Sequence, residues 1–255
     1  MLSLDRIYEE LNDLGVCPPR IFFYPETDST NLRAREYAKE NPGESAIFIA
    51  DCQSAGRGRR GRSFVSNRGA GIYISFLIYP EEKASDATQM TAKAAVALAR
   101  AVESTCNCKV DIKWVNDLYL GGKKLAGILT EGEVDSEGKI AYQVVGMGIN
   151  VYKNAISEEI SDIATSLESE TNNAPDRSGL TVKIILEFLN PKGDYYSEYK
   201  ARSFVIGREI TVIKLTESYK AKVTDLNPDF SLQIEREGKE ERLFTGEISI
   251  RGCFI

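Results

Sequence analysis

Two long strand-like runs joined by a short turn commit this chain to a β-sheet. The runs KKLAGILTEGEV (residues 123–134) and IAYQVVGMGINV (residues 140–151) are rich in apolar and β-branched residues and flank the turn sequence DSEGK. Further strands are expected at residues 20–24, 45–51, 71–79 and 109–115. Helical spacing of apolar residues predicts helices at residues 4–14, 27–43, 86–104, 179–190 and 194–203. The fold class is therefore α+β.

After Gly207 the pattern changes to short strand-like runs with no helical spacing between them. These runs are REITVIKL, SYKAKVTDL, FSLQIERE, ERLFTG and EISIRGCFI, separated by turn signals such as NPD and REGKE. Short strands at close spacing are typical of sandwiches and barrels. We therefore expect a small all-β module, built as a partly closed barrel, at the end of the chain.

The chain contains no histidine, and its formal net charge is −6. Without imidazole, Ser-His-Asp and Cys-His mechanisms are excluded, so carboxylates, lysine, tyrosine or the substrate must move protons. The acidic balance argues against a general affinity for phosphate backbones. Five cysteines without framework or metal-ligand spacing indicate reduced thiols, and no protein-held metal is expected. Because there is neither a membrane-spanning apolar run nor a signal peptide, we expect a cytoplasmic protein without a membrane partner.

One segment, SAGRGRRGRSF (Ser54–Phe64), concentrates three glycines and four arginines between two predicted strands. Glycines can bring backbone amides close to an anion, and arginines supply forked donors that suit carboxylate and phosphate. The residue types therefore favour an anion-binding loop. A solvated surface loop is one alternative. A nucleic-acid-binding patch is another, disfavoured by the net acidity and by the lack of aromatic residues interleaved in the loop.

Three further polar segments stand at the ends of predicted strands: DSTN (residues 28–31), KWVNDLYLGGKKLAGIL (residues 113–129) and GMGIN (residues 146–150). With all four motifs in order from about Tyr24 to Arg251, the chain closely resembles the biotin protein ligases. The segment TGEISIR (Thr245–Arg251) is also similar. The resemblance implies a class II synthetase-like catalytic domain over residues 1–205, with a central mixed sheet and flanking helices. It implies a C-terminal SH3-like barrel over residues 206–255.

The resemblance also implies a two-step reaction. Biotin and ATP, with Mg²⁺ on the phosphates, form biotinyl-5′-AMP, and biotin then passes to a lysine of the biotin carboxyl carrier domain of a carboxylase. By resemblance, Arg59 retains the adenylate, Lys124 contacts the biotin carboxylate and the phosphate, and Asp117 receives the proton of the acceptor lysine. The implied biotin-binding residues are Ser29, Thr30, Asn31, Gln53, Arg57, Gly58, Arg59 and Lys124. The implied ATP- or adenylate-binding residues are Gly56, Arg57, Gly58, Arg59, Phe64, Asn116, Lys124 and Asn150.

The residue types suit this chemistry even when the resemblance to the family is set aside. Biotin's carboxylate must approach the α-phosphate, and at about 4 Å in an effective dielectric of about 20 each pair of charges is worth about 4 kcal/mol. Cations beside the reacting atoms offset that repulsion. In the second step an unperturbed lysine must lose its proton at pH 7, at a cost of about 4.6 kcal/mol. A neighbouring carboxylate can position the amine and take that proton.

Several positions remain open or depart from the family. Taken alone, Ser29 and Thr30 would be expected to cap the following helix, and Trp114 is expected in the core. Val115 stands where the family usually has proline, and Phe64 where it commonly has tryptophan. The sequence does not divide the work among Arg57, Arg60 and Arg62.

The length of chain before the resemblance bears on DNA binding. Only about twenty residues precede it, whereas an independent domain generally needs at least about 40. We therefore expect the short form of the enzyme, with no DNA-binding domain and no DNA partner. A lipoate ligase of similar fold and an inactive biotin sensor are the alternatives, the second disfavoured by the presence of Arg59 and Lys124. Homodimer formation is left open.

Overall fold

The computed structural model describes residues 2–79, 87–137, 139–171, 175–214, 217–244 and 247–249. The predicted motif Thr245–Arg251 lies only partly within these residues, and Cys253 lies outside them. The strands form two sheets: a seven-stranded sheet of order β1-β2-β3-β7-β6-β5-β4, and a five-stranded sheet of order β11-β10-β9-β8-β12. The fold is α+β, as the sequence predicts.

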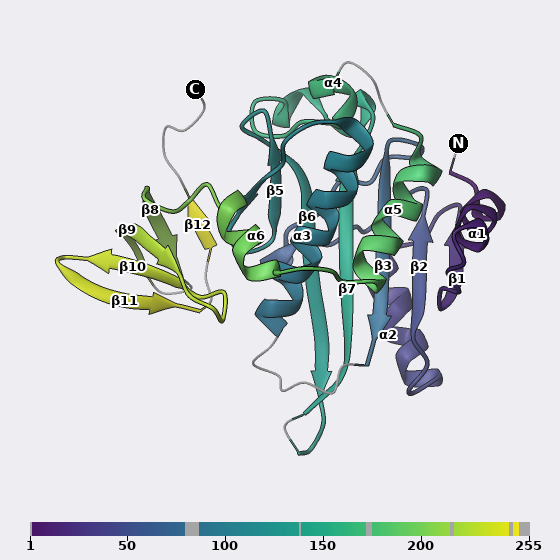
Figure 1. Ribbon diagram of the computed structural model, residues 1–255, viewed down its shortest axis with the longest axis horizontal. Coiled ribbons are helices and arrows are strands. Elements are labelled where there is room, and N and C mark those ends of the chain that lie inside the picture. Colours follow the sequence, from purple (N-terminus) through teal and green to yellow (C-terminus); the bar gives the residue numbers. More distant parts are fainter. Residues whose placement is uncertain are drawn as a thin grey trace.

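The seven-stranded sheet is mixed, because β1 and β2 run parallel while every other pair of neighbours is antiparallel. Its strands are β1 (Arg20–Tyr24), β2 (Ala46–Ala50), β3 (Gly71–Ile78), β4 (Asp111–Lys113), β5 (Asp117–Leu120), β6 (Lys123–Val134) and β7 (Ile140–Asn150). The predicted hairpin of β6 and β7 extends below the rest of the sheet in the view of Figure 1.

The helices are α1 (Leu4–Asp13), α2 (Thr30–Glu40), α3 (Ala87–Cys106), α4 (Leu167–Thr171), α5 (Arg177–Leu189) and α6 (Tyr195–Arg202). Short 3₁₀ turns lie at η1 (Arg59–Gly61), η3 (Lys153–Ala155) and η4 (Glu158–Ile160). Helices α3 and α5 cover one face of the seven-stranded sheet and α2 covers the other (Figure 1). Helices therefore pack against both faces of the sheet.

The sheet has a hydrophobic core on each of its two faces, and strand β7 illustrates how the sequence builds them. Successive side chains of a strand point to opposite faces. Val145 and Met147 belong to the larger core, under α3 and α5, while Val144 belongs to the smaller core with Ala34 and Ala38 of α2. The smaller core leaves part of the α2 face uncovered, and this is where the pocket lies.

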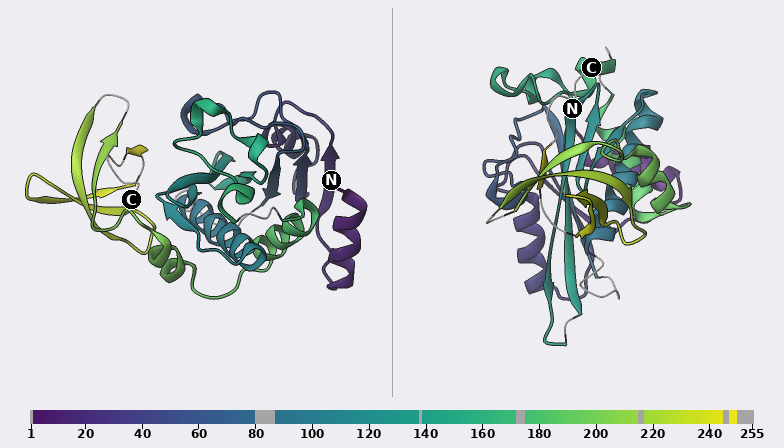
Figure 2. Two further views of the ribbon diagram at one scale, coloured as in Figure 1. Left: turned by 90° about the horizontal axis from the view of Figure 1, so that it is seen from above. Right: turned by 90° about the vertical axis from the view of Figure 1, so that its left-hand side faces the viewer.

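The C-terminal strands form the second unit, to one side of the seven-stranded sheet (Figure 2). They are β8 (Glu209–Ile213), β9 (Ser218–Leu226), β10 (Leu232–Arg236), β11 (Lys239–Leu243) and β12 (Glu247–Ser249). The edge strands β11 and β12 do not pair with each other in the described residues, so the sheet stays open there. This antiparallel unit is consistent with the expected SH3-like barrel, although it is not closed.

Two hydrogen bonds hold the chain just before Asn116, one made with the C-terminal unit and one with helix α6. The indole N–H of Trp114 donates to the carbonyl of Phe230 at 2.8 Å, and the hydroxyl of Tyr199 donates to the carbonyl of Val115 at 3.1 Å. Trp114 is 3% exposed, which confirms its expected place in the core. The second unit therefore helps to fix the segment that carries Asn116.

Candidate active site

Glycines create the pocket on the α2 face of the seven-stranded sheet. Gly146 and Gly148 of β7 share this face with Val144, and Gly127 of β6 pairs directly with Gly148. A Cβ added at Gly146 would lie 2.0 Å from Asn31 Oδ1, so no other residue fits there without a rearrangement. The space left by these glycines is a cavity of about 450 Å³.

The floor of the pocket is polar and buried. Ser29, Thr30 and Asn31 are 3–4% exposed, and they begin α2 directly beneath the cavity. Gln53 Oε1 accepts hydrogen bonds from the backbone N–H of Thr30 at 2.8 Å and from its hydroxyl at 3.1 Å. Ser29 occupies the N-cap position, but its side chain makes no capping hydrogen bond. Helix capping therefore does not account for the Ser29 hydroxyl.

Asp28 fixes the turn that leads into this floor. Its Oδ1 accepts from the backbone N–H of Ser29 at 2.6 Å, and its Oδ2 accepts from Arg33 at 2.7 Å. Burial alone would raise the pKa of Asp28, but the hydrogen bonds from Ser29 and Arg33 outweigh it and hold that pKa below its usual value. The carboxylate therefore stays charged and keeps the turn in place at neutral pH.

The arginine-glycine loop leaves β2 and returns into β3, and one buried arginine holds both of its ends. Arg177, 3% exposed, donates from Nη1 to Asp51 Oδ1 at 2.7 Å and to the carbonyl of Gly71 at 3.0 Å. Asp51 follows β2 and Gly71 begins β3. The loop is thus anchored at its stems, while its arginines are placed by contacts of their own.

Two of the loop arginines contact residues of the seven-stranded sheet and its loops. Arg59 Nη1 donates to Asn116 Oδ1 at 2.9 Å, and the amide of Asn116 donates in turn to the carbonyl of Ile128. Arg57 Nη1 lies 3.4 Å from Glu131 Oε1 on β6. Arg57 and Arg59 both line the cavity.

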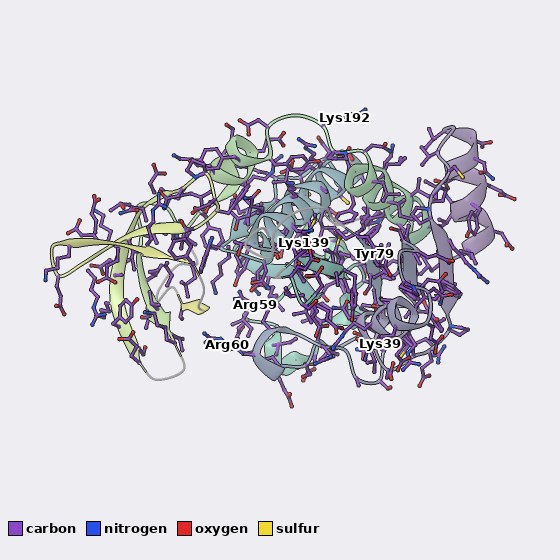
Figure 3. The ribbon with its side chains drawn as sticks, turned by 90° about the horizontal axis from the view of Figure 1, so that it is seen from below. Lys39, Arg59, Arg60, Tyr79, Lys139 and Lys192 are labelled. Atoms are coloured by element: carbon purple, nitrogen blue, oxygen red, sulfur yellow. The ribbon has the colours of Figure 1, made fainter. Side chains whose placement is uncertain are left out.

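Arg60 points to a different partner. Its Nη1 donates to the carbonyl of Ile213 on β8, at 3.0 Å, so it connects the loop to the C-terminal unit. Figure 3 shows Arg59 and Arg60 on the side of the larger unit that faces the five-stranded sheet. Ile248 and Ser249 of β12 also line the cavity. The pocket is therefore walled on this side by the second unit.

A lysine of β6 and an aspartate of β5 form an ion pair in the wall of the cavity. Lys124 Nζ lies 2.7 Å from Asp117 Oδ1, and both side chains line the cavity. Burial, followed by the neighbouring Asp117 carboxylate, raises the pKa of Tyr119 to about 12. Tyr119 also lines the cavity, and at neutral pH it is a protonated hydrogen-bond donor rather than a base.

Eleven of the thirteen predicted site residues line this one cavity: Ser29, Thr30, Asn31, Gln53, Arg57, Gly58, Arg59, Phe64, Asn116, Asp117 and Lys124. Gly56 and Asn150 do not. A Cβ at Gly56 would lie 2.3 Å from the carbonyl oxygen of Phe64, so this glycine permits the loop to fold closely on itself. Asn150 is 6% exposed, and its amide donates to the carbonyl of Thr165 at 3.1 Å.

Sequence reasoning missed two polar residues behind the floor. Ser75 Oγ on β3 lies 2.7 Å from both Thr30 Oγ1 and Asn31 Oδ1, and Glu131 Oε2 accepts from Asn31 Nδ2 at 2.9 Å. Neither residue belongs to a motif. The available signal was strand alternation, which puts Glu131 on the same face of β6 as Gly127 and therefore toward the pocket side.

The described part of the chain lacks two features. No cluster of three or more Cys, Asp or Glu side chains there has the arrangement of a metal site. None of its helices combines the length and the apolar character needed to cross a membrane.

The mixed sheet, the glycine-lined pocket and the arginine loop define an α+β enzyme that can bring anionic substrates together. The chain belongs to the biotin/lipoate A/B protein ligase family, whose family model matches residues 23–150.

Individual relatives agree with this assignment. The chain is 30% identical over 240 residues to the bifunctional ligase/repressor BirA of Bacillus subtilis, covering 90% of this chain and 74% of that protein. It is 38% identical over 156 residues to the biotin–[acetyl-CoA-carboxylase] ligase of Paracoccus denitrificans, covering 59% of this chain and 63% of that one. Its structure matches the Aquifex aeolicus biotin protein ligase in complex with biotin and ATP, with a TM-score of 0.75, 27% identity and coverage of 91% and 98%.

Proposed function

We propose that the protein is an ATP-dependent biotin ligase, which forms biotinyl-5′-AMP and transfers biotin to a lysine of a biotin carboxyl carrier domain. The observation that carries this proposal is the meeting, in one cavity, of a polar floor, two loop arginines and the Lys124–Asp117 pair. The volume of about 450 Å³ lies in the range of small-molecule sites. The similarity to a ligase that binds biotin and ATP supports the choice of substrates.

In the first step the floor and the cations bring two acids together. Ser29, Thr30 and Gln53 offer hydroxyls and an amide to the neutral ureido ring of biotin. A carboxylate oxygen of biotin then attacks the α-phosphorus of ATP, the bond to the β-phosphate breaks, and pyrophosphate leaves. Arg57 and Arg59 lie on the cavity wall where they can neutralise the two anions as they approach.

Lys124 changes partner during this sequence. Without substrate its ammonium is held by Asp117, at 2.7 Å. When biotin and the α-phosphate arrive, the ammonium turns to their oxygens, and the Asp117 carboxylate is released. That carboxylate can then accept the proton of the acceptor lysine as its amine attacks the acyl carbon and AMP leaves.

A second group of residues would contact the nucleotide. Phe64 covers one side of the cavity beside Gly148, where its ring can stack on adenine. Asn116, Gly56, Gly58 and Asn150 are the further candidates for adenylate contacts. Asn150 would have to exchange its bond to Thr165 for one to adenine.

Mg²⁺ would arrive with ATP and be held chiefly by phosphate oxygens. Among the described residues that line the cavity, Asp117 is the one carboxylate, and it is paired with Lys124. The Asp117 carboxylate is therefore the group of this cavity wall that could contribute an oxygen to the ion. When bound, the ion would withdraw charge from the phosphates.

The division of labour along the chain follows from the same proposal. Residues 1–205 would form the catalytic domain and residues 206–255 the SH3-like unit, so that the boundary falls between α6 and β8. The absence of a DNA partner is a prediction that a DNA-binding titration checks. Light scattering decides between a monomer and a homodimer, which the sequence leaves open.

The test is mass spectrometry of a biotin carboxyl carrier domain after incubation with the protein, ATP, Mg²⁺ and biotin. We expect the mass to rise by one biotinyl group at a single lysine, and no change without ATP. Lipoate offered in place of biotin distinguishes the two activities named by the family. Transfer of lipoate alone, or no transfer at all, would overturn the proposal. Steeply salt-dependent nucleic-acid binding would instead favour the alternative function of the arginine-glycine loop.

A further inference from the structure

We propose that Glu131 is a positioning residue, which orients Asn31 and Arg57 at the biotin end of the pocket and so sets the affinity for biotin. The proposal deepens the proposed function and rests on it. Glu131 itself does not line the cavity, whereas Asn31 and Arg57 do. Any effect of Glu131 on biotin must therefore pass through these two residues.

The position of Glu131 on β6 explains how one carboxylate reaches both. It faces the same side of the sheet as Leu129 and Gly127, two and four residues before it. Its side chain is 19% exposed, between the floor and the base of the loop. Oε2 accepts from Asn31 Nδ2 at 2.9 Å, and Oε1 lies 3.4 Å from Arg57 Nη1. The two oxygens thus contact two different elements of the site.

The contact with Asn31 fixes which way its amide faces. Asn31 Nδ2 donates to the carbonyl of Leu129 at 3.2 Å as well as to Glu131, so Oδ1 must face the Ser75 hydroxyl, 2.7 Å away. Ser75 can satisfy this acceptor only by donating its single proton to it. The floor is held in one hydrogen-bonding arrangement as a result, and a charged acceptor is the strongest contact that Asn31 makes.

The contact with Arg57 holds a loop side chain against the pocket. The Arg57 side chain is 48% exposed, and a long exposed side chain samples many rotamers unless a partner restrains it. Glu131 restrains it on the cavity wall, where the guanidinium can meet biotin. Arg35 of α2 lies 3.7 Å from the same Oε1, is 38% exposed and does not line the cavity. The local charge stays positive, because two arginines face one carboxylate.

Two substitutions separate the two contacts. Glu131→Gln keeps a side-chain oxygen for Asn31 and removes the charge that restrains Arg57. We expect its KM for biotin to rise about fivefold, since a hydrogen bond to a charged group exceeds a neutral one by about 1 kcal/mol. Glu131→Ala loses both contacts, and its KM should rise by at least about thirtyfold on the same reasoning. In both variants kcat and the KM for ATP should stay within about twofold of wild type, since the reacting groups remain.

Arg35→Gln is the matched control, because it removes the other arginine at Oε1 and leaves the pocket lining intact. Its KM for biotin should equal that of the wild type. A double-mutant cycle with Arg57→Gln tests the route: Glu131→Gln should add less than about twofold to the KM of Arg57→Gln, because the restrained partner is already gone. Thermal unfolding of each variant accompanies the kinetics.

The outcomes separate this inference from the proposed function. A wild-type protein that transfers no biotin would refute the proposed function first. An active wild type with an unchanged KM in both Glu131 variants would overturn the inference alone. Losses of kcat that track the fall in melting temperature, with unchanged KM, would show a merely structural role and would also overturn it. Should Glu131→Ala not fold, Glu131→Gln and the cycle decide.

Discussion

Gly146 offers the sharpest test of how the pocket is built. A methyl group at this position would have its carbon 2.0 Å from Asn31 Oδ1, whereas ordinary contact begins at 3.4 Å. Asn31 must therefore move by about 1.4 Å, the difference between these two distances, or the strand must yield. Such a shift breaks the hydrogen bonds that Asn31 makes to Leu129, Ser75 and Glu131.

The size of the effect follows from those three bonds. At about 1 kcal/mol for each neutral bond and about 2 kcal/mol for the bond to a carboxylate, Gly146→Ala should lower the free energy of unfolding by about 4 kcal/mol. In a chain of this size that corresponds to a fall of about 12 °C in melting temperature. Biotin binding should weaken more than tenfold, because the displaced amide also enters the space above the floor.

Thermal unfolding and biotin calorimetry on matched variants check this reasoning. In Gly148→Ala the new carbon lies 2.6 Å from the Phe64 ring, the end of a loop side chain that can turn away, so the loss of stability should be smaller. Asn31→Ala loses the same hydrogen bonds, so adding Gly146→Ala to it should cost little more. A melting temperature for Gly146→Ala within about 2 °C of wild type would refute the argument, since it would mean that Asn31 is not locked.

Further expectations concern the chemistry. Lys124→Ala should abolish adenylate formation, because no ammonium then reaches the two acids. A variant that keeps most of the wild-type rate of pyrophosphate release would exclude Lys124 from the mechanism. Arg59→Gly should form the adenylate but release it, so a wild-type dissociation rate would contradict this. Val115→Pro removes no reacting group and should leave adenylation largely intact; a thousandfold fall would be the opposite result. The raised pKa of Tyr119 favours the folded state below pH 10, and this stabilisation is lost as pH rises toward about 12, so Tyr119→Phe should unfold less steeply with alkaline pH.

The elements were predictable because local pattern and final environment agree. The β6–β7 hairpin has apolar residues on both of its faces, interrupted by the turn at residues 135–139, and the structure has β6 at the predicted bounds. The order of the strands was not predictable in the same way. It depends on β7 crossing to pair with β3, a contact between residues about seventy positions apart that no local signal encodes.

The residues of the site also fall into two groups, those that local sequence could predict and those that it could not. Ser29, Thr30 and Asn31 could be predicted because they sit together in one motif at a helix start. Glu131 and Ser75 could not, because each is a single polar residue inside a strand, and its partners come from distant segments. Glu131 and Ser75 contact the floor of the pocket only because helix α2 packs against strands β3 and β6 in the folded chain.

The loop shows most clearly what three dimensions add. In the sequence Arg57, Arg59 and Arg60 are nearly equivalent, since each is a charged residue beside a glycine in a flexible segment. In the structure Arg57 meets a carboxylate of β6, Arg59 meets Asn116, and Arg60 meets a carbonyl of the C-terminal unit. A guanidinium presents donors in several directions from a rigid plane, so neighbouring arginines can bind three elements at once. The loop therefore does more than supply positive charge, because the position of each cation over the pocket depends on a different part of the fold.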